Sequence, residues 1–257
     1  MALQYETHTA QAGGCEIHYA ALGSGPSLVF LHGSGGLLMD EAAFGALGKE
    51  YRVLVPSMPG FDASTLGAVA SGPDVADVVA AFIAEVAGGS AYVVGESFGG
   101  RIAAWLGIRH PEVARRLILA APGGLRRGGA ERRADAPWEE AHRRLYGRLP
   151  DRQPTAAETQ QRQANLATAI RLSGPGWDED LYQQLPSVGC PTLVLYGTSD
   201  ETLPRESIQL FVERIPGARI VDFEGAPHVL SATRPDQFVS AVGEFLKTEE
   251  APAAQKV

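Results

Sequence analysis

The stretch Ala91-Tyr92-Val93-Val94-Gly95-Glu96-Ser97-Phe98-Gly99-Gly100 decides the fold of this chain. It combines a buried apolar strand, a Gly-x-Ser-x-Gly turn and the start of a helix that we expect over residues 101–109. Gly95 and Gly99 have no Cβ, so the strand and the helix can approach closely at the turn. The sequence therefore predicts a strained turn that exposes the Ser97 hydroxyl above a sheet, with the Phe98 backbone N–H facing the same space.

The length and composition suit one large α/β domain, or such a domain with one insertion. The chain has 257 residues, 45% of them hydrophobic, which is enough for a sizeable core. Its net charge of −8 argues against nucleic acid or an anionic membrane surface as partner. The two cysteines, Cys15 and Cys190, provide neither a disulfide framework nor a metal-binding spacing. No signal peptide and no apolar run of bilayer length is visible, so we expect a cytoplasmic protein, monomeric or homodimeric.

Strand-like and helix-like segments alternate along most of the chain. Each strand reads as buried on both faces, which predicts a mostly parallel sheet of about eight strands with helices on both sides. The expected strands are an edge hairpin within 4–21, then 26–31, 51–56, 91–96, 115–121, 191–197 and 218–223. The expected helices of this α/β core are 40–48, 73–87, 101–109, 204–215 and 235–247, with a loop over 225–230.

The region 123–188 differs from the rest in composition. It carries arginine pairs, clusters of acids and several prolines, and its helical segments are expected at 137–148 and 155–172. The arginines are interpreted mainly as solvated helix faces with ion pairs. We therefore predict a core formed by 1–122 and 189–248, a helical insertion at 123–188, and a flexible polar tail at 249–257.

Four polar residues lie shortly after the ends of predicted strands: Ser34, Ser97, Asp200 and His228. In open parallel sheets ligands bind outside the carboxyl ends of the strands, so these side chains are expected at one edge. A serine nucleophile needs a base, and the base needs an acid that orients it. His228 lies in the loop after the last strand, where the order serine, acid, histidine requires the base.

The candidate acid follows the strand 191–197. Asp200 fits this position, Glu201 is the alternative, and Asp222 lies within the last strand and fits less well. Another histidine, His32, follows an apolar strand and is expected to brace its own loop by hydrogen bonding.

Together these motifs resemble the α/β-hydrolase family, in its serine-nucleophile, cap-containing branch of esterases and C–C bond hydrolases. The matching stretches are His32-Gly33-Ser34-Gly35, Gly95-Glu96-Ser97-Phe98-Gly99-Gly100, Gly197-Thr198-Ser199-Asp200 with Pro204, and Gly225-Ala226-Pro227-His228. The resemblance implies that Ser97 is the nucleophile, His228 the general base and Asp200 its orienting acid. It also implies an oxyanion hole from the backbone N–H groups of Ser34 and Phe98.

The same resemblance implies that 123–188 is a cap that roofs the substrate pocket. Gly33, Leu145, Tyr146 and Val229 are the residues expected to contact a small-molecule substrate. We expect neither a metal nor a cofactor. Family members that act as epoxide hydrolases or haloalkane dehalogenases have aspartate at the turn, so Ser97 favours acyl-enzyme chemistry.

Three functions remain open from the sequence. The first is hydrolysis of a small, largely apolar carboxylic ester, thioester or lactone. The second is C–C bond hydrolysis of ring-fission products, whose carboxylate a cap arginine such as Arg171 would bind. C–C hydrolases typically have tryptophan after the histidine, where this chain has Val229. The third is a ligand receptor that keeps the catalytic residues and turns over slowly or not at all.

Overall fold

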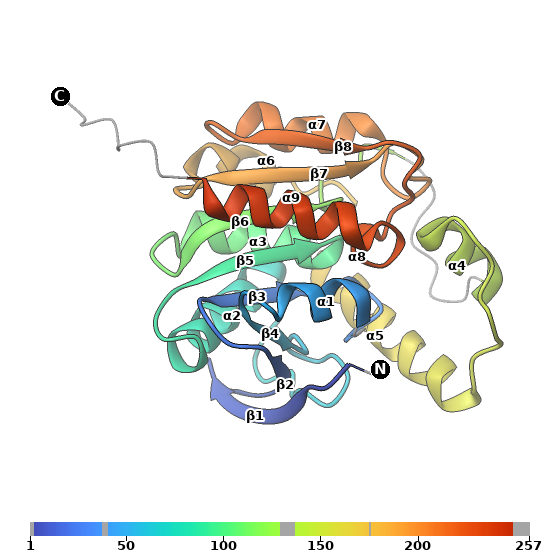
Figure 1. The fold of residues 1–257 in the computed structure, drawn as a ribbon, viewed down its shortest axis with the longest axis horizontal. Coiled ribbons are helices and arrows are strands. Elements are labelled where there is room, and N and C mark those ends of the chain that lie inside the picture. The colour runs from blue at the N-terminus through green and yellow to red at the C-terminus, as the bar shows by residue number, and fades with distance from the viewer. Residues whose placement is uncertain (1–2, 38–40, 129–136, 175, 249–257) are drawn as a thin grey trace.

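An eight-stranded sheet runs through the centre of the protein, as the computed structural model shows (Figure 1). The structure describes residues 3–37, 41–128, 137–174 and 176–248, so the tail predicted at 249–257 lies outside the described residues. The strand order is β1-β2-β4-β3-β5-β6-β7-β8. Its strands are β1 (Glu6–Ala12), β2 (Cys15–Leu22), β3 (Ser27–Leu31), β4 (Arg52–Pro56), β5 (Ala91–Glu96), β6 (Ala114–Ala120), β7 (Thr192–Gly197) and β8 (Arg219–Phe223).

The sheet is parallel from β4 to β8 and antiparallel at its N-terminal edge. Strands β1 and β2 form a hairpin, and β2 pairs antiparallel with β4. The pairs β4–β3, β3–β5, β5–β6, β6–β7 and β7–β8 are all parallel. The predicted α/β class, the mostly parallel sheet and the edge hairpin are therefore confirmed.

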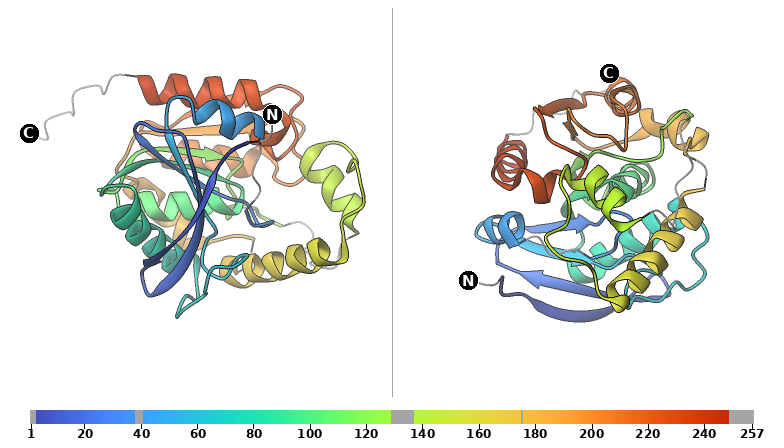
Figure 2. Two further views of the ribbon diagram at one scale, coloured as in Figure 1. Left: turned by 60° about the horizontal axis from the view of Figure 1, so that its bottom comes forward. Right: turned by 90° about the vertical axis from the view of Figure 1, so that its right-hand side faces the viewer.

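Helices cover both faces of the sheet (Figures 1 and 2). Helices α1 and α9 pack together on one face, and α2 and α3 pack together on the other. The helices outside the 123–188 region are α1 (Glu41–Leu47), α2 (Gly72–Val86), α3 (Phe98–Arg109), α7 (Arg205–Arg214), α8 (Leu230–Thr233) and α9 (Pro235–Lys247). The short helix α8 was not expected from the sequence; it begins where the predicted loop ends.

The central strands are buried on both faces, as their continuous apolar runs predict. In β3, Leu28 and Phe30 pack on the α1 and α9 side, whereas Val29 and Leu31 pack on the α2 and α3 side. The prediction that every strand is buried on both faces is wrong for the edge strand β1, in which Glu6 to Thr9 are exposed, and for β8. Strand β8 lies at the sheet edge, and the structure leaves Arg219, Val221 and Asp222 exposed there.

Between β6 and β7 the chain forms helices α4 (Trp138–Tyr146), α5 (Ala156–Ser173) and α6 (Glu179–Gln184), followed by a 3-10 turn at Leu185–Ser187. Helices α4 and α5 lie beyond the carboxyl ends of the parallel strands, on the right of Figure 1. The sequence predicted α4 and α5 but not α6. Asp178 caps α6 by accepting a hydrogen bond from the Leu181 N–H, and the Leu181 side chain is fully buried.

Candidate active site

Ser97 occupies the tight turn between β5 and α3. Its φ of 58° and ψ of −111° lie in a region that residues with a side chain rarely adopt. A Cβ on Gly95 would lie 2.2 Å from the carbonyl oxygen of Gly99. A Cβ on Gly99 would lie 2.0 Å from the carbonyl oxygen of Leu31. The strand and the helix are thus packed so closely around the serine that only glycine fits on either side of it.

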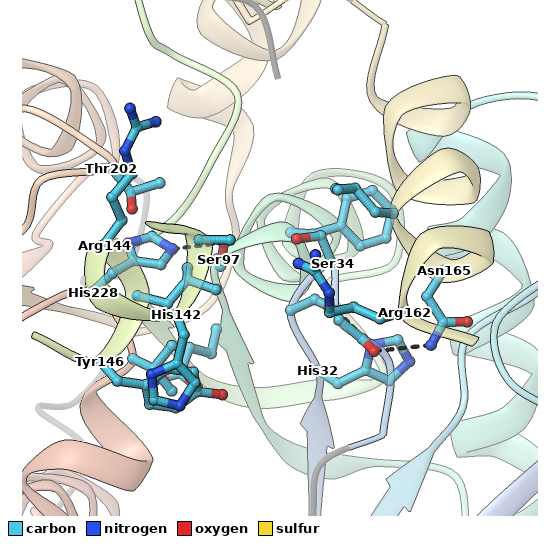
Figure 3. A pocket seen from close by; sticks show the side chains of 18 of the residues that line it. His32, Ser34, Ser97, His142, Arg144, Tyr146, Arg162, Asn165, Thr202 and His228 are labelled. Atoms are coloured by element: carbon cyan, nitrogen blue, oxygen red, sulfur yellow. Dashed lines mark hydrogen bonds between the residues drawn. The ribbon is translucent and has the colours of Figure 1, made fainter. Parts of the chain in front are cut away.

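Three side chains form a continuous hydrogen-bonded chain at this edge, and Figure 3 shows two of them, Ser97 and His228. The Ser97 Oγ is 2.8 Å from Nε2 of His228. On the other side of the ring, Nδ1 is 2.6 Å from Oδ2 of Asp200. The side chains of His228 and Asp200 are only 1% and 0% exposed, so solvent does not compete for these bonds. The structure brings together the three residues that the sequence analysis singled out as serine, base and acid.

The loop after β7 fixes the Asp200 carboxylate. Its Oδ1 accepts hydrogen bonds from the backbone N–H groups of Thr202, at 2.6 Å, and Leu203, at 3.0 Å, which leaves Oδ2 for the histidine. The two other candidate acids lie elsewhere. Glu201 forms an exposed ion pair with Arg143, and Asp222 forms one with Arg205. Of the three candidates, Asp200 is the carboxylate that contacts His228 in the structure.

The loop after β3 lies beside Ser97. A Cβ on Gly33 would be 3.5 Å from the Ser97 Cβ. His32 braces this loop, because its Nδ1–H donates to the Gly33 carbonyl at 2.8 Å and its Nε2 accepts from the Met58 N–H at 3.0 Å. Burial lowers the pKa of His32, and the bond from Met58 requires an unprotonated Nε2. The bracing role expected of His32 is therefore confirmed, with the ring neutral.

Glu96, the residue before the serine, is a buried carboxyl group that joins two parts of the site. It accepts hydrogen bonds from the Ser231 N–H, at 3.1 Å, and the Ser231 hydroxyl, at 2.8 Å. Burial raises the pKa of Glu96, and the two bonds from Ser231 act in the opposite direction. Since Ser231 lies in α8, directly after the His228 loop, Glu96 ties that loop to the serine turn.

A cavity of about 2230 Å³ opens over Ser97 and His228. Its walls include all four residues expected to contact a substrate: Gly33, Leu145, Tyr146 and Val229. Helix α4 supplies an aromatic wall, in which the His142 and Tyr146 rings stack with their centroids 4.5 Å apart. The Val229 N–H donates to the Leu145 carbonyl at 3.0 Å, so α4 is attached to the loop that carries His228.

The family model described as "Alpha/beta hydrolase family" matches residues 28–241. The chain belongs to the alpha/beta hydrolase family. The match spans the serine turn, the loop with Asp200, the loop with His228 and the whole region 123–188. The strained serine turn of this α/β-hydrolase and the loops that carry Asp200 and His228 therefore all lie inside the segment that matches the family model.

Curated relatives of this α/β-hydrolase include two kinds of enzyme. The chain is 29% identical over 252 residues to a pimeloyl-acyl-carrier protein methyl ester esterase of Aeromonas hydrophila, covering 87% of this chain and 96% of that protein. It is also 29% identical over 277 residues to a 2-hydroxymuconate semialdehyde hydrolase of a Pseudomonas species, covering 94% of each protein.

A solved structure gives the same architecture. The serine hydrolase involved in carbazole degradation, the CarC enzyme, matches with a TM-score of 0.78 and 22% identity, over 95% of this chain and 99% of that chain. At that identity the likeness shows the fold alone. It agrees with the mostly parallel, helix-covered sheet described above.

The structure separates two arginines of α5 by their position relative to the cavity. Arg171 is exposed on α5 and is not among the residues that line the cavity. Arg162, on another face of the same helix, does line it. Its guanidinium stacks 4.9 Å from the Trp138 ring centroid, and its Nε is buried with no hydrogen-bond partner among the residues that the structure describes. The periodicity of an exposed helix does not show which of its arginines faces a cavity, because that depends on how the helix docks.

Sequence analysis also missed Asn165, a buried amide on α5 that contacts the loop after β3. A polar residue in the middle of a polar helix gives no signal of burial. Four arginines of this region follow the sequence interpretation by forming exposed ion pairs: Arg143, Arg144, Arg148 and Arg152. The pair Arg132-Arg133 lies outside the described residues.

In the ranges that the structure covers, no helix is long and apolar enough to cross a membrane. Among the same residues, no group of three or more histidine, cysteine, aspartate or glutamate side chains is arranged to hold a metal ion. The thiols of Cys15 and Cys190 are free and buried.

Proposed function

We propose that this α/β-hydrolase cleaves a small, largely apolar carboxylic ester, thioester or lactone through an acyl-enzyme on Ser97. One observation carries the proposal: the enclosed hydrogen-bonded chain from Ser97 through His228 to Asp200. Its two distances of 2.8 and 2.6 Å suit a nucleophile, a base and an orienting acid. The similarity to a methyl ester esterase supports the same bond type.

In the first half of the reaction the Ser97 oxygen attacks the ester carbonyl carbon, while Nε2 of His228 accepts the serine proton. Asp200 keeps the other ring proton on Nδ1 and stabilises the imidazolium that forms. Collapse of the tetrahedral intermediate breaks the bond to the alcohol oxygen, which takes the proton from Nε2 as it leaves. The product of this half is an acyl group on Ser97.

In the second half, water replaces the alcohol. His228 takes a proton from the water, whose oxygen attacks the acyl carbon, and the intermediate then collapses with return of that proton to Ser97. The carboxylic acid leaves and the free enzyme is regenerated. The negative oxygen in both halves would accept hydrogen bonds from the backbone N–H groups of Ser34 and Phe98, which flank the serine turn.

We infer further that 123–188 acts as a cap that selects the substrate. Leu145, Tyr146, Leu166 and Ile170 from α4 and α5 line the cavity above Ser97 and offer apolar contact to an acyl or alcohol chain. The core supplies the reacting groups, so changes in the cap are expected to alter specificity more than the chemical step.

A second candidate, hydrolysis of a C–C bond in a keto acid, is favoured by one observation. Arg162 lines the cavity, its buried Nε has no hydrogen-bond partner within the described part of the chain, and a guanidinium binds a carboxylate well. The semialdehyde hydrolase among the relatives is consistent with this alternative. Val229 replaces the tryptophan typical of C–C hydrolases, so ester cleavage remains the preferred reaction.

Steady-state turnover separates the candidates. We expect sustained release of p-nitrophenol from p-nitrophenyl butyrate, at many turnovers per enzyme. Faster turnover of a coloured 2-hydroxy-6-oxo-dienoate than of the ester would favour the C–C reaction instead. Labelling of Ser97 by a fluorophosphonate with no turnover of either substrate would indicate a receptor and contradict both enzymatic proposals.

A further inference from the structure

Asn165 is a buried amide in α5, and three of its four hydrogen bonds reach Gly35 and Asp62, outside its own helix. Asn165 is only 1% exposed. A buried amide without hydrogen-bond partners would destabilise the folded protein. The Nδ2 group donates to the Gly35 carbonyl and to Oδ1 of Asp62, each at 2.8 Å. The Oδ1 atom accepts from the Asp62 N–H and from Nε2 of Gln161, each at 3.0 Å. Both N–H groups and both acceptor positions are thus used, which fixes the orientation of the amide.

Asp62 completes the attachment of the loop after β3. Its Oδ2 accepts hydrogen bonds from the Leu37 N–H and the Ser57 hydroxyl, each at 2.9 Å. Its φ of 49° is unusual for a residue with a side chain, so the surrounding bonds hold it in a strained conformation. Gly36 passes so close to the pair that a Cβ there would lie 2.1 Å from Nδ2 of Asn165. Asn165 and Asp62 therefore hold the loop tightly at Gly35 and at Leu37.

The loop itself forms a turn around Ser34. The Gly36 N–H donates to the Gly33 carbonyl at 3.2 Å, and the His32 ring donates to the same oxygen at 2.8 Å. The peptide that carries this carbonyl also carries the Ser34 N–H, which points the opposite way. His32 thus fixes the start of the turn, which lies beside Ser97.

The other end of the turn depends on α5. We propose that Asn165 is a positioning residue, which holds the 33–36 turn from α5 so that the Ser34 N–H faces the oxygen of the reacting carbonyl. The proposal rests on the proposed function, since Ser34 acts there as an oxyanion donor. Such donors stabilise a transition state only when they are already in position, and a small displacement of the donor lowers the reaction rate.

The same helix also contacts the cavity. Arg162, Leu166 and Ile170 of α5 line it, and Arg162 and Asn165 lie on the Ser34 side of the site in the view of Figure 3. One element therefore belongs both to the substrate pocket and to the support of the oxyanion turn. Under this proposal the region 123–188 does more than cover the pocket, because it also positions an oxyanion donor.

The test compares two variants of Asn165 with a matched control on the same helix. Asn165→Ala removes all four hydrogen bonds. Asn165→Asp keeps the shape but replaces the donor that faces Gly35 and Asp62 with an acceptor. The control is Thr168→Val, which removes the α5 hydrogen bond to the Gly60 carbonyl, at 3.2 Å, without touching the 33–36 turn.

For each folded variant we would measure kcat and KM with p-nitrophenyl butyrate, and the inhibition constant of a trifluoromethyl ketone. The ketone adds to the serine and places a negative oxygen where the reacting oxyanion forms. We expect both Asn165 variants to lose roughly tenfold to a hundredfold in kcat and in ketone affinity, with KM changed by less than about threefold. Thr168→Val should stay within about twofold of wild type in all three.

The proposal is overturned if the Asn165 variants match Thr168→Val in kcat and ketone affinity, because Asn165 then only anchors the helix. If neither Asn165 variant folds, Asp62→Asn provides the same test. The two carboxylate oxygens of Asp62 accept from Leu37 and from Asn165, and the single amide oxygen of asparagine cannot replace both. A wild-type protein that turns over no ester would overturn the proposed function, and this proposal with it. Active wild-type enzyme with unaffected variants would overturn this proposal alone.

Discussion

Asp200 and His228 are joined by a 2.6 Å hydrogen bond between Oδ2 and Nδ1, in a pocket that excludes solvent from both side chains. This bond requires the ring proton on Nδ1, which leaves Nε2 free to accept the Ser97 proton. Asp200→Asn should lower kcat roughly a thousandfold to ten-thousandfold, because the amide favours the other tautomer and cannot stabilise imidazolium. Steady-state kinetics on p-nitrophenyl butyrate would measure the loss.

Glu201→Gln is the matched control for that variant. Glu201 is the neighbouring carboxylate, but its partner is Arg143 and both side chains are about half exposed. Surface ion pairs of this kind contribute little, so kcat should stay within about threefold of wild type. A larger loss in Glu201→Gln than in Asp200→Asn would show that the wrong acid has been assigned.

Tyr146→Ala tests the proposed cap. Tyr146 lines the cavity and stacks on His142, so its removal takes apolar contact from a long acyl chain. We expect kcat/KM for p-nitrophenyl octanoate to fall about tenfold, and that for the acetate by less than about threefold. Leu149→Ala is the control, because Leu149 is 61% exposed and does not line the cavity. Equal losses on both esters in Tyr146→Ala would contradict a role in specificity.

His32 should make stability depend on pH. Burial lowers its pKa in the folded protein, so between that value and the ordinary value of about 6.5 the unfolded chain binds more protons. Its stabilising contribution is therefore complete above about pH 6.5 and is lost as the pH falls through the folded pKa.

The measurement is urea unfolding of wild type and His32→Gln from pH 8 to pH 5. At high pH the variant should be less stable, because it loses the bonds to Gly33 and Met58. The difference in free energy of unfolding should then shrink as the pH falls. A difference that stays constant with pH would show that His32 does not titrate in this range.

The order of strands and helices could be predicted because the signals are local. Apolar runs such as Leu28 to Leu31 mark strands buried on both faces, and the glycines around Ser97 mark a turn that only glycine permits. The meeting of Ser97, Asp200 and His228 could be anticipated because residues that follow parallel strands share one edge of the sheet.

Other features depend on tertiary contacts that no local pattern contains. Helix α6 is short and owes its place to the burial of Leu181 and to the Asp178 cap. The exposure of β8 follows from its position at the edge of the sheet. Arg162 lines the cavity and Arg171 does not, because the two arginines lie on different sides of α5. The burial of Asn165 depends on its contact with the loop after β3.

The most direct test of the account is the turnover of p-nitrophenyl butyrate by Ser97→Ala. The substitution removes the attacking oxygen but little buried surface, so the variant should unfold at nearly the wild-type temperature. The account predicts that kcat/KM falls by more than about a thousandfold, because the serine, its base and its acid act as a unit. A folded Ser97→Ala protein that keeps more than about a tenth of the wild-type kcat/KM would contradict the assignment of Ser97 as the nucleophile.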